Sequence, residues 1–105
     1  LIALKQDDLN TAQSEIKKAL GQTQSEAQIY SAAGQIAMAK KDFTQAQRHF
    51  STAIGINGNH FRYFLGRGLA AKALGQNASA RTDLKRSQSL FPSQAAAQAL
   101  ADLGG

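Results

Sequence analysis

Residues 63–76 read YFLGRGLAAKALGQ and place Gly66 and Gly68 on either side of Arg67. A phosphate-binding loop with two such glycines follows a strand and opens onto the N-terminus of a helix. Here both glycines lie inside a helical pattern of small and apolar residues, so their backbone N–H groups are used in the hydrogen bonds of the helix. The stretch therefore predicts a helix that ends at Gly75, and not a nucleotide site.

A shift of 34 residues aligns the chain with itself without a gap, so the stretch is one of several copies. Gly34 falls on Gly68, and Ala46 falls on Ala80. Residues as small as these let two helices approach to about 8–10 Å, so we expect them where one helix crosses the next. The same shift adds Ala12 to the alanines and aligns the large apolar residues Ile16, Phe50 and Leu84, which are expected in the core.

The composition favours helices and a single domain. The chain has 105 residues, one proline and no valine, and alanine supplies much of its 43% hydrophobic content. Alanine favours helices, whereas strands are rich in β-branched residues. We therefore predict one all-α domain. The chain has no cysteine, which excludes disulfides and zinc sites built on cysteine.

The positive charge is spread along the chain. Twelve Lys and Arg residues outnumber seven Asp and Glu residues, for a formal net charge of +5, and the longest basic run is two residues. Proteins that bind nucleic acids concentrate their charge on one face, so we predict no nucleic-acid partner. No apolar run approaches the roughly 18 residues of a membrane span, so we predict no membrane insertion.

Capping residues predict where the helices begin and end. Asp8 precedes a helix at about 9–21, and Ser25 with Gln28 forms a capping box for a helix that ends near Lys40. The later helices are expected to begin after Asp42, Asn59, Asn77 and Ser93, and to end before Gly58, at Gly75, before Pro92 and at Gly104.

Two helices in every 34 residues resemble the tetratricopeptide repeat (TPR). The resemblance rests on Tyr30, Gly34, Ala37, Lys41, Asp42, Phe43, Ala46, Phe50 and Ala53 in 27–60, and on Phe64, Gly68, Ala71, Gly75, Ala80, Leu84 and Pro92 in 61–94. It implies an all-α, right-handed α-solenoid of antiparallel helix pairs. The single TPR domain at 1–105 then comprises a partial repeat at 1–26, full repeats at 27–60 and 61–94, and a capping helix at 93–103, whose Leu100 and Leu103 cover the end of the stack.

The resemblance implies a non-catalytic scaffold that binds a peptide or a partner protein in a groove lined by the first helix of each pair. The groove positions hold Gln28, Ser31, Gln35 and Met38, then Arg62, Leu65, Leu69 and Lys72, and Leu4 and Lys5 extend the row. This amphipathic row with a basic rim suits an extended or helical peptide of acidic character. The Asn-Lys-Arg clamp of chaperone-tail-binding members is not matched, because Ala32 and Gly66 stand where its asparagine is expected.

Two features set this chain apart from the family pattern. Arg67 stands where a large apolar residue is usual, and we expect its stem to pack and its head to reach the surface or to pair with Asp83. Among the aromatic residues, Phe61 and Tyr63 are expected to be exposed, while the core is expected to hold Tyr30, Phe43, Phe50, Phe64 and Phe91.

The sequence offers no constellation for catalysis. Its two histidines, His49 and His60, have no second His, Asp or Glu at the spacing that would put two metal ligands on one helix face. We assign both to surface or capping roles. We predict no enzyme activity, no metal and no cofactor.

Two alternatives use the same fold. Residues 63–93 are similar to the tetratricopeptide tails of bacterial envelope proteins, among them the zinc metalloproteases that support outer-membrane assembly. The chain would then be a C-terminal docking or regulatory tail in the periplasm or envelope, and an H-E-x-x-H motif upstream in its parent would support this. The other alternative is a self-association module, a weak homo-oligomer formed through a truncated N-terminal face, because residues 1–6 are only the tail of a helix.

Overall fold

The structure is a computed structural model that describes residues 26–104 of the chain. This range contains no strand. Its five helices are α2 (Glu26–Ala39), α3 (Phe43–Ile56), α4 (Phe61–Ala73), α5 (Asn77–Leu90) and α6 (Gln94–Asp102). The all-α prediction is confirmed, and each helix ends within about two residues of its expected position.

The N-terminal predictions lie outside the described residues. They comprise the partial repeat at 1–26, the helix at about 9–21 with its cap Asp8, the capping box at Ser25, and the groove residues Leu4 and Lys5. The core positions expected for Ala12 and Ile16 lie outside the described range as well.

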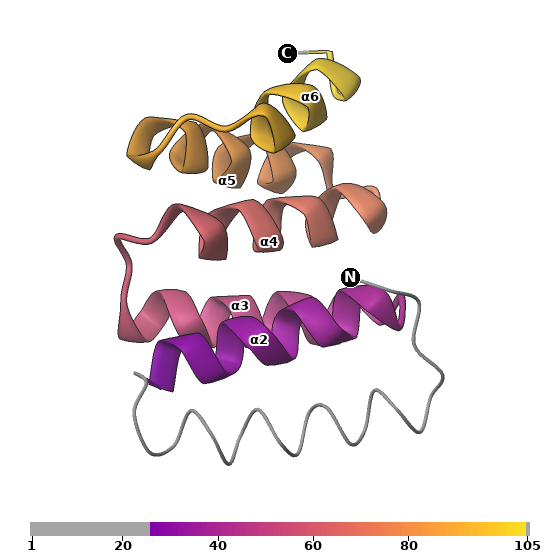
Figure 1. The fold of residues 1–105 in the computed structure, drawn as a ribbon. Coiled ribbons are helices and arrows are strands. Elements are labelled where there is room, and N and C mark those ends of the chain that lie inside the picture. Colours follow the sequence, from indigo (N-terminus) through magenta and orange to yellow (C-terminus); the bar gives the residue numbers. More distant parts are fainter. Residues whose placement is uncertain (1–25, 105) are drawn as a thin grey trace.

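The described helices form two layers. The antiparallel pairs α2–α3 and α4–α5 stack on each other through α3 and α4. In Figure 1, α2 passes in front of α3 and α6 passes in front of α5, and α4 contacts both α2 and α6. The first helices of the pairs therefore share one layer with α6, which stands where the first helix of a further pair would stand. Leu100 of α6 and Leu103, the residue that follows α6, pack on the core of the last pair, as predicted.

Small residues bring the helices of each pair into contact. Ala46 and Ala80 are fully buried. A Cβ atom added to Gly34 would lie 2.8 Å from Cζ of Phe50, and one added to Gly68 would lie 2.9 Å from Cγ of Leu84. Both distances are too short for carbon atoms that are not bonded to each other. The close approaches predicted from the 34-residue repeat are therefore present in both pairs.

Matching turns join the helices of each pair. The N–H group of Asp42 donates to the carbonyl of Ala37 at 2.9 Å, and Lys41 adopts a positive φ of 60°. In the second pair the N–H group of Gln76 donates to the carbonyl of Ala71 at 2.9 Å, and Gly75 has a φ of 78°. These bonds define the Schellman motif, which satisfies carbonyls at the end of a helix.

Two of the predicted helix caps are confirmed and two are wrong. Asp42 accepts from the N–H group of Gln45 at 3.3 Å, and Ser93 accepts from that of Ala96 at 3.3 Å. Asn59 does not cap α4. Its own N–H group donates to Asn57 in the preceding turn, so the chain enters the helix one residue later.

The residue that caps α4 is His60, whose Nδ1 atom accepts from the N–H group of Arg62 at 3.3 Å. Before α5 the expected cap, Asn77, is already the first residue of the helix, and the capping position belongs to Gln76. The Gln76 side chain makes no cap bond and instead accepts from Gln47 of α3 at 2.7 Å. A contact between the two pairs therefore replaces the local cap.

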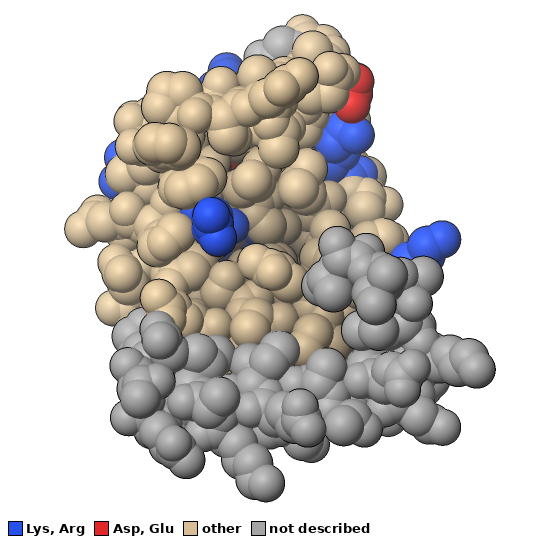
Figure 2. Space-filling model, in the orientation of Figure 1, with Lys and Arg blue, Asp and Glu red and all other residues tan. Residues whose placement is uncertain are grey.

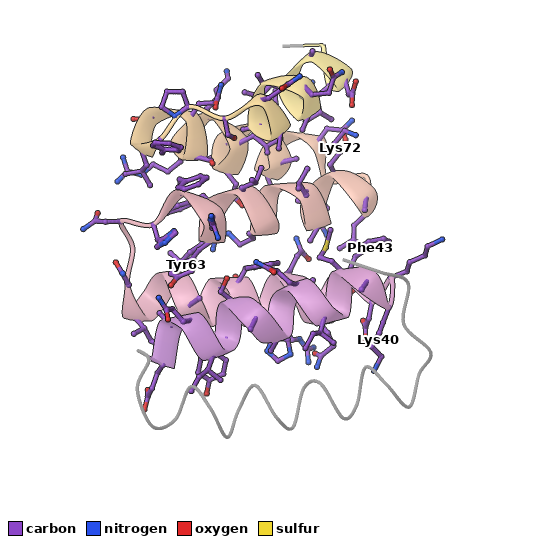
Figure 3. The ribbon with its side chains drawn as sticks, in the orientation of Figure 1. Lys40, Phe43, Tyr63 and Lys72 are labelled. Atoms are coloured by element: carbon purple, nitrogen blue, oxygen red, sulfur yellow. The ribbon has the colours of Figure 1, made fainter. Side chains whose placement is uncertain are left out.

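The aromatic residues differ most from expectation. Tyr63 is buried, not exposed, because its face of α4 turns toward the first pair, where it packs on Ala27 and Ala53. Figure 3 shows it between α4 and that pair. Burial raises the pKa of the Tyr63 hydroxyl above its ordinary value. Phe91 was expected in the core, but 57% of its surface is exposed. It lies in the turn after α5, where its ring packs against that of Phe61.

Tyr30 was also expected in the core, and 36% of its surface is exposed. Its ring stacks against His49 of α3 with the ring centres 6.4 Å apart. Phe50 is buried as predicted, with 1% of its surface exposed, and Phe43 is partly buried against the same cluster. Position along a helix therefore predicted the innermost aromatic residue correctly, but not those near the ends of the helices.

Candidate functional site

A hollow lies between α2 and α4 on the layer formed by the first helices. Its volume is about 510 Å3, and it is lined by Gln35, Met38, Phe50, Phe61, Arg62, Leu65, Gly66 and Leu69. A smaller hollow of about 170 Å3 adjoins it and is lined by Gln28, Ser31, Ala32, Gln35, His60, Arg62 and Tyr63. Gln35 and Arg62 border both. The structure thus brings together all the predicted groove residues of α2 and three of those of α4.

The apolar wall of the larger hollow is supported by the core. Leu65 and Leu69 pack against the buried cluster that contains Ala71 and Leu84. On the opposite side, Met38 packs against the cluster that contains Phe50. Each wall residue is partly buried, so its position is fixed by neighbours while one side stays open to the hollow.

Arg62 supplies the charge of this surface. Its side chain is exposed, and its guanidinium carbon lies 5.8 Å from the ring centre of Phe61. No residue that lines either hollow is acidic. Figure 2 shows the described part of this face as mostly uncharged, with Lys and Arg side chains set apart from one another. Among the described residues that line the two hollows, Arg62 is therefore the one that carries a positive charge.

The remaining predicted groove residues are placed differently. Ser31 borders the smaller hollow but is 94% buried, so its hydroxyl offers little surface to a ligand. Lys72 lines neither hollow; its Nζ atom lies 3.5 Å from Oδ2 of Asp102, and Figure 3 shows it beside α6. Both partners of that pair are well exposed, and such pairs contribute little to stability.

Sequence reasoning missed three residues that line the larger hollow, namely Phe50, Phe61 and Gly66. Phe50 was expected only in the core, yet the edge of its ring reaches the hollow from α3. Gly66 was considered as part of a phosphate-binding loop and as a departure from the Asn-Lys-Arg clamp, but not as a groove residue. A Cβ atom at Gly66 would lie 2.3 Å from Cζ of Phe50, so the glycine is what lets the ring approach α4. The sequence did contain a signal for this close approach, because Gly66 is a second glycine, two residues before Gly68, in the same short helix.

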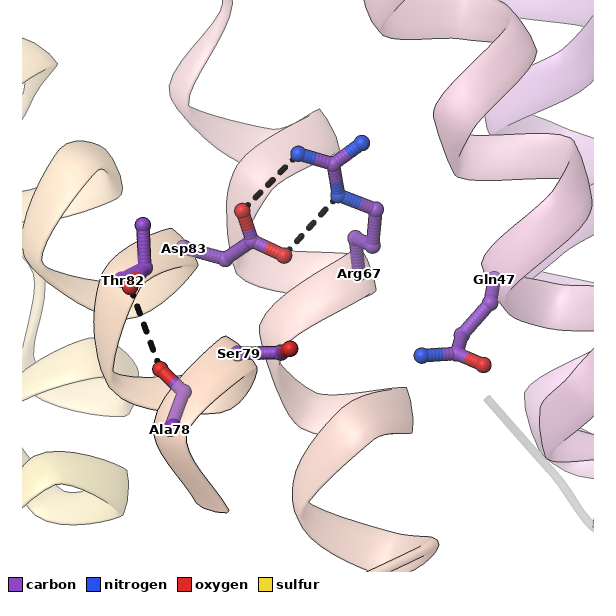
Figure 4. Close-up of a pocket in the computed structure, with 6 residues that line it drawn as sticks. All are labelled: Gln47, Arg67, Ala78, Ser79, Thr82 and Asp83. Atoms are coloured by element: carbon purple, nitrogen blue, oxygen red, sulfur yellow. Dashed lines mark hydrogen bonds and ion pairs between the residues drawn. The ribbon is translucent and has the colours of Figure 1, made fainter. Parts of the chain in front are cut away.

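Arg67 pairs with Asp83, the partner that the sequence suggested. Nε and Nη2 of Arg67 each donate to one oxygen of Asp83 at 2.9 Å, and Nη1 donates to Oγ of Ser51 at 3.3 Å. The Asp83 side chain is only 9% exposed. Figure 4 shows the two groups face to face across the α4–α5 contact. Because both carboxylate oxygens are engaged, the pair is primarily a link between two helices.

A third hollow, of about 420 Å3, lies beside this ion pair. It is lined by Gln47, Arg67, Ala78, Ser79, Thr82 and Asp83, and Figure 4 shows Gln47 across from α5. Its polar groups are largely used within the protein: Thr82 donates to the carbonyl of Ala78 at 3.1 Å, and Gln47 donates to Gln76. It therefore has fewer groups available to a ligand than the groove on the opposite layer.

Residues 26–104 contain no group of three or more His, Asp or Glu side chains that could hold a metal ion. In the same part of the chain, no helix is long and apolar enough to cross a membrane. The two α2–α4 hollows offer apolar side chains and one guanidinium group.

Comparison with known proteins identifies the repeat and the fold. Residues 27–60 match the family model described as Tetratricopeptide repeat. Among solved structures, the Arabidopsis OM64 TPR domain superposes with a TM-score of 0.83 and 22% sequence identity, over 93% of this chain and 82% of that chain. No curated protein matches the chain. Residues 27–60 are thus similar to a tetratricopeptide repeat, and the chain has the fold of a tetratricopeptide domain.

Proposed function

We propose that this chain is a non-catalytic protein-interaction scaffold that binds a peptide or a segment of a partner protein between α2 and α4. The tetratricopeptide fold supports this class of function, because a stack of helix pairs presents a long concave surface to a partner. The observation that carries the proposal is the pair of adjoining hollows, which join exposed side chains of two successive first helices into one surface.

The groove suits a partner segment with both apolar and acidic character. Met38, Leu65 and Leu69 offer apolar contact, and Gln35 at the border can pair with a backbone or side-chain amide. Arg62 favours a carboxylate, since the guanidinium group can donate two parallel hydrogen bonds to it. Lys72 lies further along α4 and would extend the positive rim once its exposed pair with Asp102 opens.

A peptide-library screen against the wild-type chain and the double variant Arg62→Glu, Lys72→Glu tests the proposal. We expect the variant to lose most acidic hits, because two attractive charges become repulsive. A matched control is Arg48→Glu, Lys85→Glu, which makes the same change of charge at exposed sites on α3 and α5. Unchanged binding of every hit by the Arg62–Lys72 variant would sink the proposal.

The two alternatives remain predictions with tests of their own. Self-association predicts a molecular mass that rises with concentration in light scattering, and a strict monomer at high concentration would contradict it. The docking-tail alternative uses the same groove, and it predicts an H-E-x-x-H motif in the parent sequence.

A further inference from the structure

The α2–α4 hollow borders on an aromatic ring that is held between two glycines. The ring of Phe50 meets both Gly34 of α2 and Gly66 of α4, and a Cβ atom on either would lie within 2.8 Å of its tip. Phe50 is 1% exposed, so the ring is fixed by its surroundings. Because Gly66 has no side chain, the ring packs directly against the backbone of α4 at the border of the hollow.

The next junction along the stack is built differently. A step of 34 residues leads from Phe50 to Leu84 and from Gly66 to Leu100. Leu100 of α6 packs on the cluster that contains Leu84, so a side chain of the chain itself covers that junction. At the α2–α4 junction the corresponding position is bare. The described residues leave the hollow beside Gly66 open, so an apolar group of a partner can enter it there.

The walls favour one large apolar group. Met38, Leu65, Leu69 and Phe61 line the hollow, and the polar residues of the lining are confined to Gln35 and Arg62. The volume of about 510 Å3 is within the range of sites that enclose small organic groups. A methyl-sized side chain would leave most of this apolar surface wet, whereas a leucine, methionine or aromatic side chain would cover it.

The positive charge beside the hollow favours an acidic residue next to the apolar side chain of the partner. Arg62 is the one charged residue in the lining, and it lies against Phe61 at the border of both hollows. Its guanidinium group makes no ion pair among the described residues. A carboxylate close to the apolar group can therefore reach it without displacing an internal partner.

From these contacts we infer that the α2–α4 hollow is an anchor site for a single large apolar side chain of the partner, with an adjacent partner carboxylate bound by Arg62. The inference rests on the proposed function and makes it more specific. It predicts that replacing the apolar anchor of a bound peptide by alanine weakens binding about 10- to 100-fold, which is the scale of one buried side chain. Replacing the nearby acid by its amide weakens it less.

The chain supplies a reporter inside the site. Met38 is its sole methionine and lines the hollow, so a 13C-methyl methionine label gives one protein signal there, which Met38→Leu assigns. Three probes separate the two parts of the inference. They are 3-phenylpropionate, which has ring and carboxylate, 3-phenylpropionamide, which has the ring alone, and propionate, which has the carboxylate alone. Ligands of this size bind in about the millimolar range.

We expect 3-phenylpropionate to shift the Met38 methyl signal saturably, 3-phenylpropionamide to do so several-fold more weakly, and propionate to have little effect. Arg62→Gln should bring the acid and the amide to equal affinity while both still bind. The matched control Lys85→Gln, at an exposed site of α5, should leave all three titrations unchanged. Equal shifts by propionate and 3-phenylpropionate, or no shift by any probe up to its solubility limit, would overturn the inference.

The failure of the anchor site and the failure of the groove are distinguishable. If the library hits lose binding in the Arg62→Glu, Lys72→Glu variant but show no preference for a large apolar residue, the groove stands and the anchor site is wrong. If the Met38 signal responds as expected while every library hit ignores the charge reversal, the hollow binds apolar acids and the scaffold proposal is wrong.

Discussion

Residues 27–60 and 61–94 build the same pair of helices from different side chains. Both keep glycine and alanine where the backbones touch, at Gly34 with Ala46 and at Gly68 with Ala80. Elsewhere the pairs diverge: the ring of Phe50 corresponds to Leu84, the positive-φ turn uses Lys41 in one and Gly75 in the other, and Ala33 corresponds to Arg67. Where two helix backbones touch, only a small residue fits. At other positions the size or charge of the side chain can vary if a neighbouring residue changes to match it.

The compensation is visible around each variable position. The larger Phe50 is accommodated by a second glycine, Gly66, whereas Leu84 is covered by Leu100. The charge of Arg67 is accommodated by Asp83, whereas the corresponding residue of the first pair, Ala33, is small and buried. The α2–α4 hollow lies at the first junction, where Gly66 contributes no side chain and the second junction has Leu100. The following substitutions test how much these neighbouring residues contribute to the stability of each helix pair.

The largest effect is expected for Phe50→Ala. The ring fills the space between two helices that have no side chain of their own at Gly34 and Gly66, so its loss leaves a cavity that neither glycine can fill. We expect a loss of about 3–5 kcal/mol in the free energy of unfolding, measured by urea titration. Thr52→Ala, at an exposed site of α3, should change it by less than about 0.5 kcal/mol. A similarly small effect for Phe50→Ala would contradict the claim that the ring fills the space between α2 and α4.

The ion pair should show a smaller but clear coupling. Asp83→Ala removes two charge-assisted hydrogen bonds and leaves the partly buried Arg67 unpaired, so we expect a loss of about 1.5–3 kcal/mol. In a double-mutant cycle with Arg67→Ala, the combined loss should be well below the sum of the single losses.

The exposed pair Lys72–Asp102 provides the control cycle, and there we expect a coupling of about 0.2–1 kcal/mol. If the two cycles gave the same coupling energy, burial and two-point geometry would not be what distinguishes Arg67 and Asp83.

Gly66→Ala tests directly whether the large ring of Phe50 requires a glycine at position 66. Its new methyl group would collide with the Phe50 ring, and forcing an extra carbon into a packed core costs about 1–3 kcal/mol. In the background Phe50→Leu, which imitates the second pair, the same change should cost much less. Equal costs in the two backgrounds would show that the ring does not require the glycine.

The smallest effects concern the turns. Gly75→Ala should destabilise the chain by about 1–2 kcal/mol, because a side chain disfavours the positive φ of 78° at this residue. Lys41→Gly should stabilise the first pair by up to about 1 kcal/mol for the converse reason.

Gly55→Ala is the control, since Gly55 lies within α3 with open space around it, and there alanine should stabilise the helix by about 1 kcal/mol. Thermal or urea unfolding measures all three changes. A loss of stability at Gly55 would mean that the cost at Gly75 is not specific to its backbone angle.

Much of the fold was predictable because the 34-residue period repeats the positions where helices touch. It located Gly34, Gly68, Ala46 and Ala80, and it placed the capping helix over the last pair. The wrong caps at Asn59 and Asn77 have a common cause, since several nearby side chains can satisfy the same N–H groups. Their choice depends on contacts such as Gln47 with Gln76, which join residues far apart in the sequence.

The sequence by itself determined the helices, their pairing and the close contacts, because glycine and alanine at fixed spacing leave one way for the backbones to approach. Only the tertiary structure decided the interior of the groove. It buried Tyr63, turned Ser31 inward, paired Lys72 with Asp102 and placed Phe50 beneath Gly66. These outcomes depend on how one helix pair is rotated against the next, and that rotation results from the packing of side chains from several helices at once.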